Sequence, residues 1–337
     1  MEKRACPKLS KRRGRRPCYY NPHCPDSKRT LLDVFLWKVG YYDAPVKEPR
    51  APEGFSYPIP NAPLDPSAPT VTWINHSTFL IRINGLNILT DPIWSERCSP
   101  ISFLGPKRKH LPPIEIAALP QIDLVLISHD HYDHLDKRTV RALARRFPKI
   151  IWLVPKGVKR WFDKQKIASV CECSWWEDLE LAFPKLHLKA TAVPAQHYSG
   201  RSARDLNTTL WAGWIVEFRR ESELPKSLYF VGDTGYNPHD FKQIGKLWPQ
   251  IDLSLIPIGA YQPRKFMSPV HIGPKEAVLI HKEVSAKLSI GMHWKTFPSL
   301  SDEGASQPPF DLLNAMREER LNPATFLALE PGHEINW

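Results

Sequence analysis

From residue 70 onward the sequence is a series of short apolar segments, each ended by a turn or a polar residue. Segments of this length, rich in Val, Ile, Leu and aromatic residues, are typical of β-strands. The Asn84-Gly85 pair between two of them is the dipeptide of a tight hairpin. Helical spacing of apolar residues predicts helices at 136–147, 274–284 and 310–321. The pattern therefore predicts β-sheets covered by helices.

Residues 1–66 differ in composition from the rest of the chain. The first thirty residues contain ten Lys and Arg against two acidic residues, and a Pro-rich stretch precedes residue 67. Neither stretch can build an apolar core. Between them, the apolar segment 31–42 is expected to form a helix that packs on the main domain, or else a contact with a membrane surface. We expect a basic, Pro-rich extension at 1–66 and one large domain at 67–337.

The overall charge and the cysteines restrict the partners and the compartment. A net charge of +11 suits contact with phosphate groups, whether of nucleic acid, an anionic membrane or a small substrate. The six cysteines show no regular spacing, which favours a reduced, cytoplasmic setting. No apolar stretch approaches the roughly 18 to 20 residues that span a bilayer, so we expect neither a spanning helix nor export.

The densest group of chemically active side chains lies in "LISHDHYDHLD", residues 126–136. His129, His131, Asp133 and His134 form an H-x-H-x-D-H pattern directly after an apolar strand. Four such residues in six positions would each need a buried polar partner if they only filled a core. Imidazole and carboxylate are instead the ligands that zinc, iron or manganese take in proteins. The pattern predicts a metal site with room for two ions.

Two ions need more donors than one loop supplies, and other strand ends offer them. His197, Asp233, His293 and His333 each follow a predicted strand. A rigid sheet can hold ligands at such positions. Asp233, with two carboxylate oxygens, suits a bridge between two metals. His293 and His333 compete for the last ligand position.

With these residues in place, the chain resembles the metallo-β-lactamase superfamily, and within it the N-acyl phosphatidylethanolamine phospholipase D-like hydrolases. The segments that carry the resemblance are "TWINHST", "LTDPIWSERCSP", "GPKRKH", "VLISHDHYDHLD", "PAQHYSGR", "VGDTGYNP", "IPIGAYQPRKFM", "MHWKTF" and "GHE", in this order. They extend over about four-fifths of the chain. The resemblance implies an α+β fold, a four-layer αβ/βα sandwich of two mixed sheets flanked by helices, with 67–337 as the catalytic domain.

The resemblance also implies roles for individual residues. One zinc would be held by His129, His131 and His197, the second by Asp133, His134 and His333, and Asp233 would bridge them. His293 would act in catalysis beside Asp233 and, with Tyr132, contact the substrate phosphate, although a histidine at such a position binds metal in many members of the superfamily. Asp91, in "LTDP", would orient the metal loop.

The implied reaction is the zinc-dependent hydrolysis of N-acyl phosphatidylethanolamine to N-acylethanolamine and phosphatidic acid through a metal-bound hydroxide. The implied partners are this phospholipid, an anionic membrane surface on which the protein would be peripheral, and a second copy of the chain; nucleic acid is not expected. The alternatives are another hydrolase of the same fold, such as a lactonase acting on a phosphorylated sugar, a β-lactam hydrolase or a nuclease, and a non-catalytic lipid- or RNA-binding protein.

Overall fold

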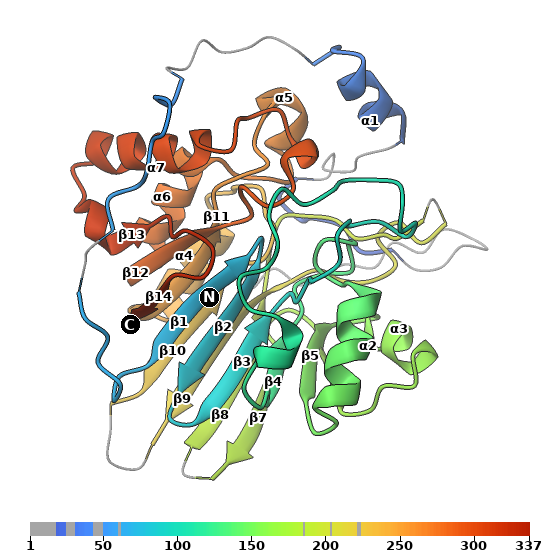
Figure 1. Cartoon of the computed structure of the whole chain (residues 1–337), viewed down its shortest axis with the longest axis vertical. Helices are drawn as coiled ribbons and strands as arrows, with labels where there is room; N and C mark the ends of the chain where they lie inside the picture. The colour runs from blue at the N-terminus through green and yellow to red at the C-terminus, as the bar shows by residue number, and fades with distance from the viewer. Residues whose placement is uncertain are drawn as a thin grey trace.

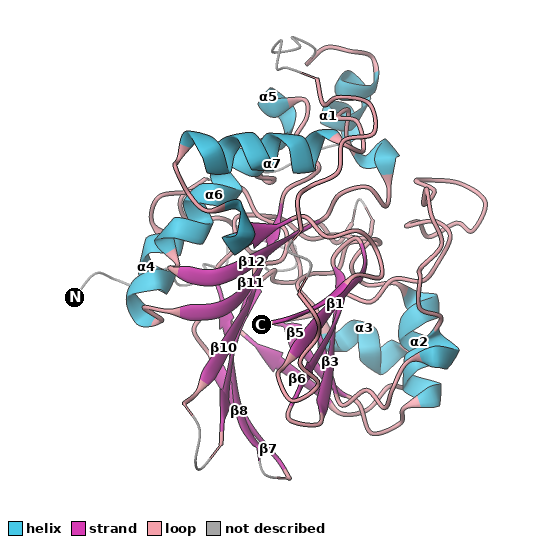
Figure 2. Cartoon of the chain, turned by 60° about the vertical axis from the view of Figure 1, so that its left-hand side comes forward, coloured by secondary structure: helices cyan, strands magenta, loops and turns pink. Residues whose placement is uncertain are grey.

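The computed structural model describes residues 18–24, 31–42, 50–59, 62–184, 186–202, 204–220 and 224–337. Within these residues two mixed β-sheets pack face to face, and helices cover the outer face of each sheet (Figure 1, Figure 2). The four-layer sandwich predicted from the sequence is confirmed.

The first sheet has the strand order β14-β1-β2-β3-β4-β5-β6 in the described part of the chain. Its strands are β1 (Thr70–Asn75), β2 (Thr78–Ile83), β3 (Leu86–Thr90), β4 (Leu124–Leu126), β5 (Ile151–Pro155), β6 (Val170–Cys173) and β14 (Glu334–Asn336). The pairs from β14 to β3 are antiparallel, and those from β3 to β6 are parallel. Asn84 and Gly85 form the predicted hairpin turn with φ angles of 51° and 81°.

The second sheet has the strand order β13-β12-β11-β10-β9-β8-β7. Its strands are β7 (Asp178–Phe183), β8 (Leu186–Val193), β9 (Gly213–Arg219), β10 (Lys226–Phe230), β11 (Ile251–Pro257), β12 (Ala286–Met292) and β13 (Phe326–Leu327). The pairs from β7 to β10 are antiparallel, and those from β10 to β13 are parallel. Because β8 and β10 are both antiparallel to β9, they run in the same direction.

Helices flank each sheet. The elements are α1 (Leu31–Lys38), α2 (Lys137–Arg146), α3 (Lys159–Lys164), α4 (Asp240–Leu247), α5 (Arg264–Met267), α6 (Pro274–Glu283) and α7 (Gln307–Glu318), with short 3-10 turns at Ile116–Ala118, Pro298–Leu300 and Pro323–Thr325. Helices α2 and α3 lie outside the first sheet, and α4, α6 and α7 outside the second (Figure 2). Helix α2 begins after Asp136, whose carboxylate accepts hydrogen bonds from Arg138 N and Thr139 Oγ1, as its predicted N-cap role requires. No helix in the described ranges is long and apolar enough to cross a membrane.

The core follows from the alternation of side chains along the strands. Phe79 and Ile81 of β2 pack between the sheets in one cluster with Trp214, whereas Leu80 points to the outer face and packs in a cluster with Val140 of α2. Burying a side chain of this size contributes about 1.5–3 kcal/mol. The packed sheets therefore form a rigid base for the loops that leave them.

The carboxyl ends of the parallel strands set the position of the polar loops. In the first sheet β1, β3 and β4 end at one edge, and in the second sheet β8, β10 and β12 do the same. A hydrogen bond from His293 N to His76 O, 3.0 Å long, ties the two edges together. The strand-end loops that carry the predicted ligands therefore meet at one rim of the sandwich.

Described parts of the N-terminal extension pack on this sandwich. In the predicted helix α1, the buried Trp37 stacks on Phe266 of α5 at 5.2 Å, and its Nε1 donates to Asp302 Oδ2 at 2.7 Å. Tyr57 is buried, and its hydroxyl donates to the Phe326 carbonyl at 2.6 Å. The helix at 31–38 therefore has the contact with the main domain that the sequence suggested.

Candidate metal centre

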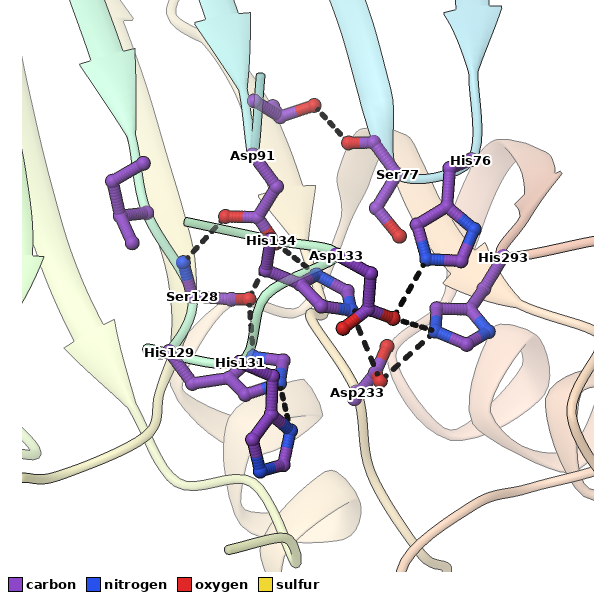
Figure 3. Close-up of polar contacts among 12 residues, drawn as sticks. His76, Ser77, Asp91, Ser128, His129, His131, Asp133, His134, Asp233 and His293 are labelled. Atoms are coloured by element: carbon purple, nitrogen blue, oxygen red, sulfur yellow. Dashed lines mark hydrogen bonds and ion pairs between the residues drawn. The ribbon is translucent and has the colours of Figure 1, made fainter. Parts of the chain in front are cut away.

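Loops from both sheets bring a cluster of His and Asp side chains together at this rim (Figure 3). The side chains come from the loops after β1, β4, β8, β10 and β12 and are His76, His129, His131, Asp133, His134, His197, Asp233 and His293. Most are buried, while His131 and Asp133 are partly exposed. The cluster is therefore open to solvent on the side of the 131–133 loop.

Three histidines form the first group. His129 Nε2 lies 2.8 Å and His197 Nε2 3.2 Å from His131 Nδ1. On the other side of its ring, His197 Nδ1 lies 2.9 Å from the Val270 carbonyl, which can only accept, so this nitrogen carries the proton. His129 Nδ1 faces the Ser128 hydroxyl at 2.8 Å. Three ring nitrogens thus point at one position, as the ligands of a metal do.

The second group forms around Asp133. Its Oδ2 lies 3.0 Å from His76 Nε2, 3.3 Å from His134 Nε2 and 3.5 Å from His293 Nε2. His134 Nδ1 lies 2.6 Å from the Asp91 carboxylate, so the proton of this ring is on Nδ1 and its Nε2 is left to bind. One carboxylate and three imidazoles can therefore face a second ion.

Asp233 lies between the two groups. Its Oδ2 is 3.2 Å from His134 Nε2 and 3.1 Å from His293 Nε2, and 3.9 Å from His197 Nε2 in the first group. The carboxylate is buried, and its Oδ1 has no hydrogen-bond partner among the described residues. This position suits the bridging role that the sequence suggested for Asp233.

The structure does not bring His333 to the cluster, so its predicted place at the second metal is wrong. His333 is exposed, in the turn before β14. Its carbonyl accepts from Trp73 N, because the chain end returns as an edge strand beside β1 and this turn belongs to that pairing. His293, which competed with it, supplies Nε2 to the second group instead. A His293 that binds metal through Nε2 cannot use this nitrogen for the phosphate contact predicted from the sequence.

His76 of the cluster and His271 beside it were not identified from the sequence. His76 follows β1 in "TWINHST", so the strand-end rule that found the other ligands could have found it. His271 follows the short helix α5 rather than a strand, which that rule does not cover. Its Nδ1 lies 3.8 Å from Asp233 Oδ2, and its ring centroid is 5.1 Å from that of His197.

Asp91 and Arg201 both hold the metal loop through hydrogen bonds. Fully buried Asp91 accepts from Ser128 N at 2.7 Å and Ser128 Oγ at 2.5 Å, in addition to its contact with His134. The Arg201 guanidinium lies 3.9 Å from the Tyr132 ring centroid and donates to the carbonyls of Asp130 and Leu135 at 2.7 and 2.9 Å. The partly buried Tyr132, whose hydroxyl donates to Arg201 O, is thus fixed at the open side of the cluster.

Several cluster residues have uncommon backbone conformations. His76, Asp91 and His293 have φ angles of 46°, 30° and 62°, in the left-handed region that side chains rarely adopt. Such conformations cost about 1–3 kcal/mol each and gather at functional sites. The surrounding fold therefore holds these residues in place at some cost to stability.

Burial and charge set the protonation states that a metal needs. Burial, together with the neighbouring His197, lowers the pKa of His131 to about 3, and burial lowers the pKa of His197 to about 4. Burial alone would raise the pKa of Asp233, but His134 and His293 outweigh it and hold this pKa well below its ordinary value. Burial likewise opposes a charge on His293, but Asp233 and Asp133 raise the pKa of this histidine to about 9. His131 and His197 thus have the neutral form and Asp233 the ionised form that bind metals, whereas a metal ion at His293 would have to displace a proton.

The donor set fits divalent metal ions. Asp233 Oδ1 is buried without a hydrogen-bond partner in the described ranges, and His134 Nε2 and His293 Nε2 face carboxylate oxygens. Buried polar atoms are rarely left in this way unless an ion or water completes them. The carboxylates of Asp233 and Asp133 raise the pKa of His293, and a metal cation at this point would offset the same negative charge. The geometry thus supports a metal centre of two adjacent positions.

Comparisons with known proteins also indicate a metal-dependent hydrolase. The model of the β-lactamase superfamily domain matches residues 86–294. N-acyl-phosphatidylethanolamine-hydrolyzing phospholipase D 1 of Caenorhabditis elegans is 41% identical over 269 residues, which are 77% of this chain and 74% of that protein. The mitochondrial N-acyl-phosphatidylethanolamine-hydrolyzing phospholipase D of Saccharomyces cerevisiae is 36% identical over 227 residues, 67% of this chain and 47% of that protein. Among solved structures, the metallo hydrolase Igni18 of Ignicoccus hospitalis has a TM-score of 0.58 and 21% identity over 80% of this chain and 98% of its own.

Proposed function

This chain belongs to the β-lactamase superfamily, in the group that contains the worm N-acyl-phosphatidylethanolamine-hydrolyzing phospholipase D, and from this premise we propose that it is a phosphodiesterase of phospholipase D type. It is a metal-dependent hydrolase. The proposed reaction converts N-acyl phosphatidylethanolamine and water to N-acylethanolamine and phosphatidic acid. The observation that carries the proposal is the 41% identity to the worm protein. In addition, the family match at 86–294 contains every cluster residue except His76.

The proposed cofactors are two zinc ions, although the donor set also suits other divalent transition metals. His129, His131 and His197 would hold one ion, Asp133, His134 and His293 the other, and Asp233 would touch both. Bound zinc would lower the pKa of a coordinated water toward neutrality and offset the negative charge of the phosphate.

The side chains around the ions would position the substrate. Asp233 would fix the distance between the two ions from its buried place between the groups. His271 Nδ1, buried and without a hydrogen-bond partner among the described residues, can donate to a phosphate oxygen. Tyr132, at the open side of the cluster, can contact the arriving phosphodiester, as the resemblance implied. These groups would orient the phosphorus for attack from the side of the metals.

Exposed apolar residues support contact with a lipid surface. They are Leu32, Phe35, Val39 and Tyr41 in and after α1, and Ile101, Phe103, Leu104 and Leu111 in the loop after β3. Both segments are tied to loops of the site: Trp37 of α1 packs on α5, which precedes His271, and Lys109 N donates to the carbonyl of Thr296 near His293. We propose a peripheral position on the inner, anionic face of a membrane, with the basic residues before position 30 adding attraction.

Direct assay tests the reaction. Purified protein is incubated with zinc and N-acyl phosphatidylethanolamine in mixed micelles, and both products are measured by mass spectrometry. Wild type should form N-acylethanolamine and phosphatidic acid in equal amounts, and Asp233→Asn should lose this activity. Asp123→Asn is the matched control, because it removes the same charge from a carboxylate at the opposite end of β4, where Asp123 accepts from Asn87 N at 2.9 Å. A wild type that is inert on this lipid yet cleaves RNA or a soluble lactone would overturn the substrate assignment.

The membrane contact is tested separately with anionic liposomes. Phe35→Glu should reduce sedimentation with liposomes and leave hydrolysis in mixed micelles unchanged, because the residue lies outside the metal cluster. Leu224→Glu is the control, since Leu224 is 91% exposed in the loop before β10, at the strand end opposite Asp233. Equal liposome binding by wild type and Phe35→Glu would contradict a role for this surface.

A further inference from the structure

A short N-terminal segment, residues 18–24, lies against the loop that carries His197. The sequence placed this segment in a tail without a core, but Tyr19 is buried in the main core and its N–H donates to the Asn207 carbonyl at 2.8 Å. At the other end of the segment, His23 stacks on His239 with ring centroids 4.5 Å apart. Residues 18–24 are thus anchored on both sides of position 21.

Asn21 makes the central contact of this segment. It is 2% exposed, and its Nδ2 donates to the His197 carbonyl at 2.7 Å. Its Oδ1 accepts from His197 N at 3.2 Å and from Trp211 Nε1 at 3.2 Å. One amide side chain therefore pairs with both the N–H and the C=O of a single residue, as a neighbouring strand would.

This pairing acts at a point where the chain has left regular structure. Strand β8 ends at Val193, four residues before His197. The ring of His197 is held at its Nδ1 by the Val270 carbonyl at 2.9 Å, and its backbone by Asn21. The two contacts fix the direction of Nε2, which lies 3.2 Å from His131 Nδ1. Ligands whose outer contacts are lost typically give metal affinities about 10–100-fold weaker.

We propose that residues 18–24 are part of the metal centre and that Asn21 is a positioning residue for the ligand His197. Asn21 touches neither metal position nor substrate and acts through the backbone of His197. A catalytic unit that began at residue 67, as the composition suggested, would lack this contact. The inference rests on the proposed metal centre but not on the proposed substrate.

The test compares zinc affinity of full-length variants by competition with a chelator, starting from metal-free protein. Asn21→Ala should lower the affinity for one of two zinc ions about 10–100-fold and leave the affinity for the second nearly unchanged. His23→Ala is the matched control, because it loosens the same segment without touching His197. It should lower the melting temperature of the metal-free protein by a similar amount and keep wild-type zinc affinity.

Two outcomes would overturn the inference. Asn21→Ala with wild-type affinity for both ions, or with a loss no larger than that of His23→Ala, would make Asn21 an ordinary packing residue. If Asn21→Ala does not fold, Asn21→Asp serves instead, since it keeps the acceptor for His197 N and loses the donor to the His197 carbonyl; wild-type affinity in that variant would refute the role. A wild type that binds two zinc ions but does not hydrolyse the lipid would refute only the proposed substrate.

Discussion

Replacement of Asp91 by Asn tests how the protein prepares a metal ligand without touching the metal. The carboxylate accepts from Ser128 N at 2.7 Å and from His134 Nδ1 at 2.6 Å, in a fully buried position. Asn has one acceptor and one donor group, so either orientation of its amide sets an N–H against another N–H. Ser128 Oγ can rotate and accept instead, but Ser128 N and His134 Nδ1 cannot.

The expected magnitude follows from these contacts. A hydrogen bond to a buried charged group contributes about 1.5–3 kcal/mol. To avoid the opposed N–H groups, His134 would move its proton to Nε2, the nitrogen that faces Asp133 and Asp233 at 3.3 and 3.2 Å. Zinc must then displace this proton, and its affinity should fall about 10–100-fold, or about 1.4–2.7 kcal/mol.

The assay is zinc competition with a chelator, together with the melting temperature of the metal-free protein. Asp91→Asn should lower the affinity for the zinc ion at the Asp133 group more than the affinity for the ion at His129, His131 and His197. Asp123→Asn, which loses charge at the other end of β4, should leave zinc affinity at the wild-type value. Unchanged zinc affinity and activity in Asp91→Asn would refute the tautomer argument.

The remaining predictions concern other parts of the chain. His293→Ala should abolish binding of one zinc ion, whereas His333→Ala should retain both ions and full hydrolysis; the reverse result in a metal-content measurement would restore the original ligand assignment. Arg201→Lys should raise KM several-fold without changing zinc content, because a single ammonium cannot both bridge two carbonyls and cover the Tyr132 ring. A wild-type KM in steady-state kinetics would contradict this. Burial lowers the pKa of His281 to about 4. Between pH 6.5 and 4 the folded protein therefore binds fewer protons than the unfolded chain, so the free energy of unfolding is highest above pH 6.5 and decreases as the pH falls toward 4. Between pH 6.5 and 4 the free energy of unfolding, measured in urea, should fall by up to about 3 kcal/mol less in His281→Gln than in wild type. An equal fall in the two proteins would contradict this.

The features that depend on neighbouring residues were predicted well from the sequence. The H-x-H-x-D-H spacing, the hairpin at Asn84 and Gly85 and helix α2 each arise from contacts within a few residues, and the structure has all three. The positions of His197 and Asp233 at strand ends were predictable as well, because side chains that follow parallel strands meet at one edge of a sheet. The resemblance to the metallo-β-lactamase superfamily, carried by the same motifs, is confirmed by the family match.

The features that depend on long-range pairing were decided by the tertiary structure. The sequence by itself determined the fold class, the metal loop and the strand-end donors, because local spacing and apolar periodicity encode them. It could not choose between His293 and His333, since that choice depends on the register in which β14 returns beside β1 and turns His333 outward. Nor could it place Asn21 against His197, 176 positions further along the chain, because an asparagine in a basic, Pro-containing segment gives no local signal of its partner. Such contacts form only when the two sheets and the extension have packed, and they decide which donors become a site.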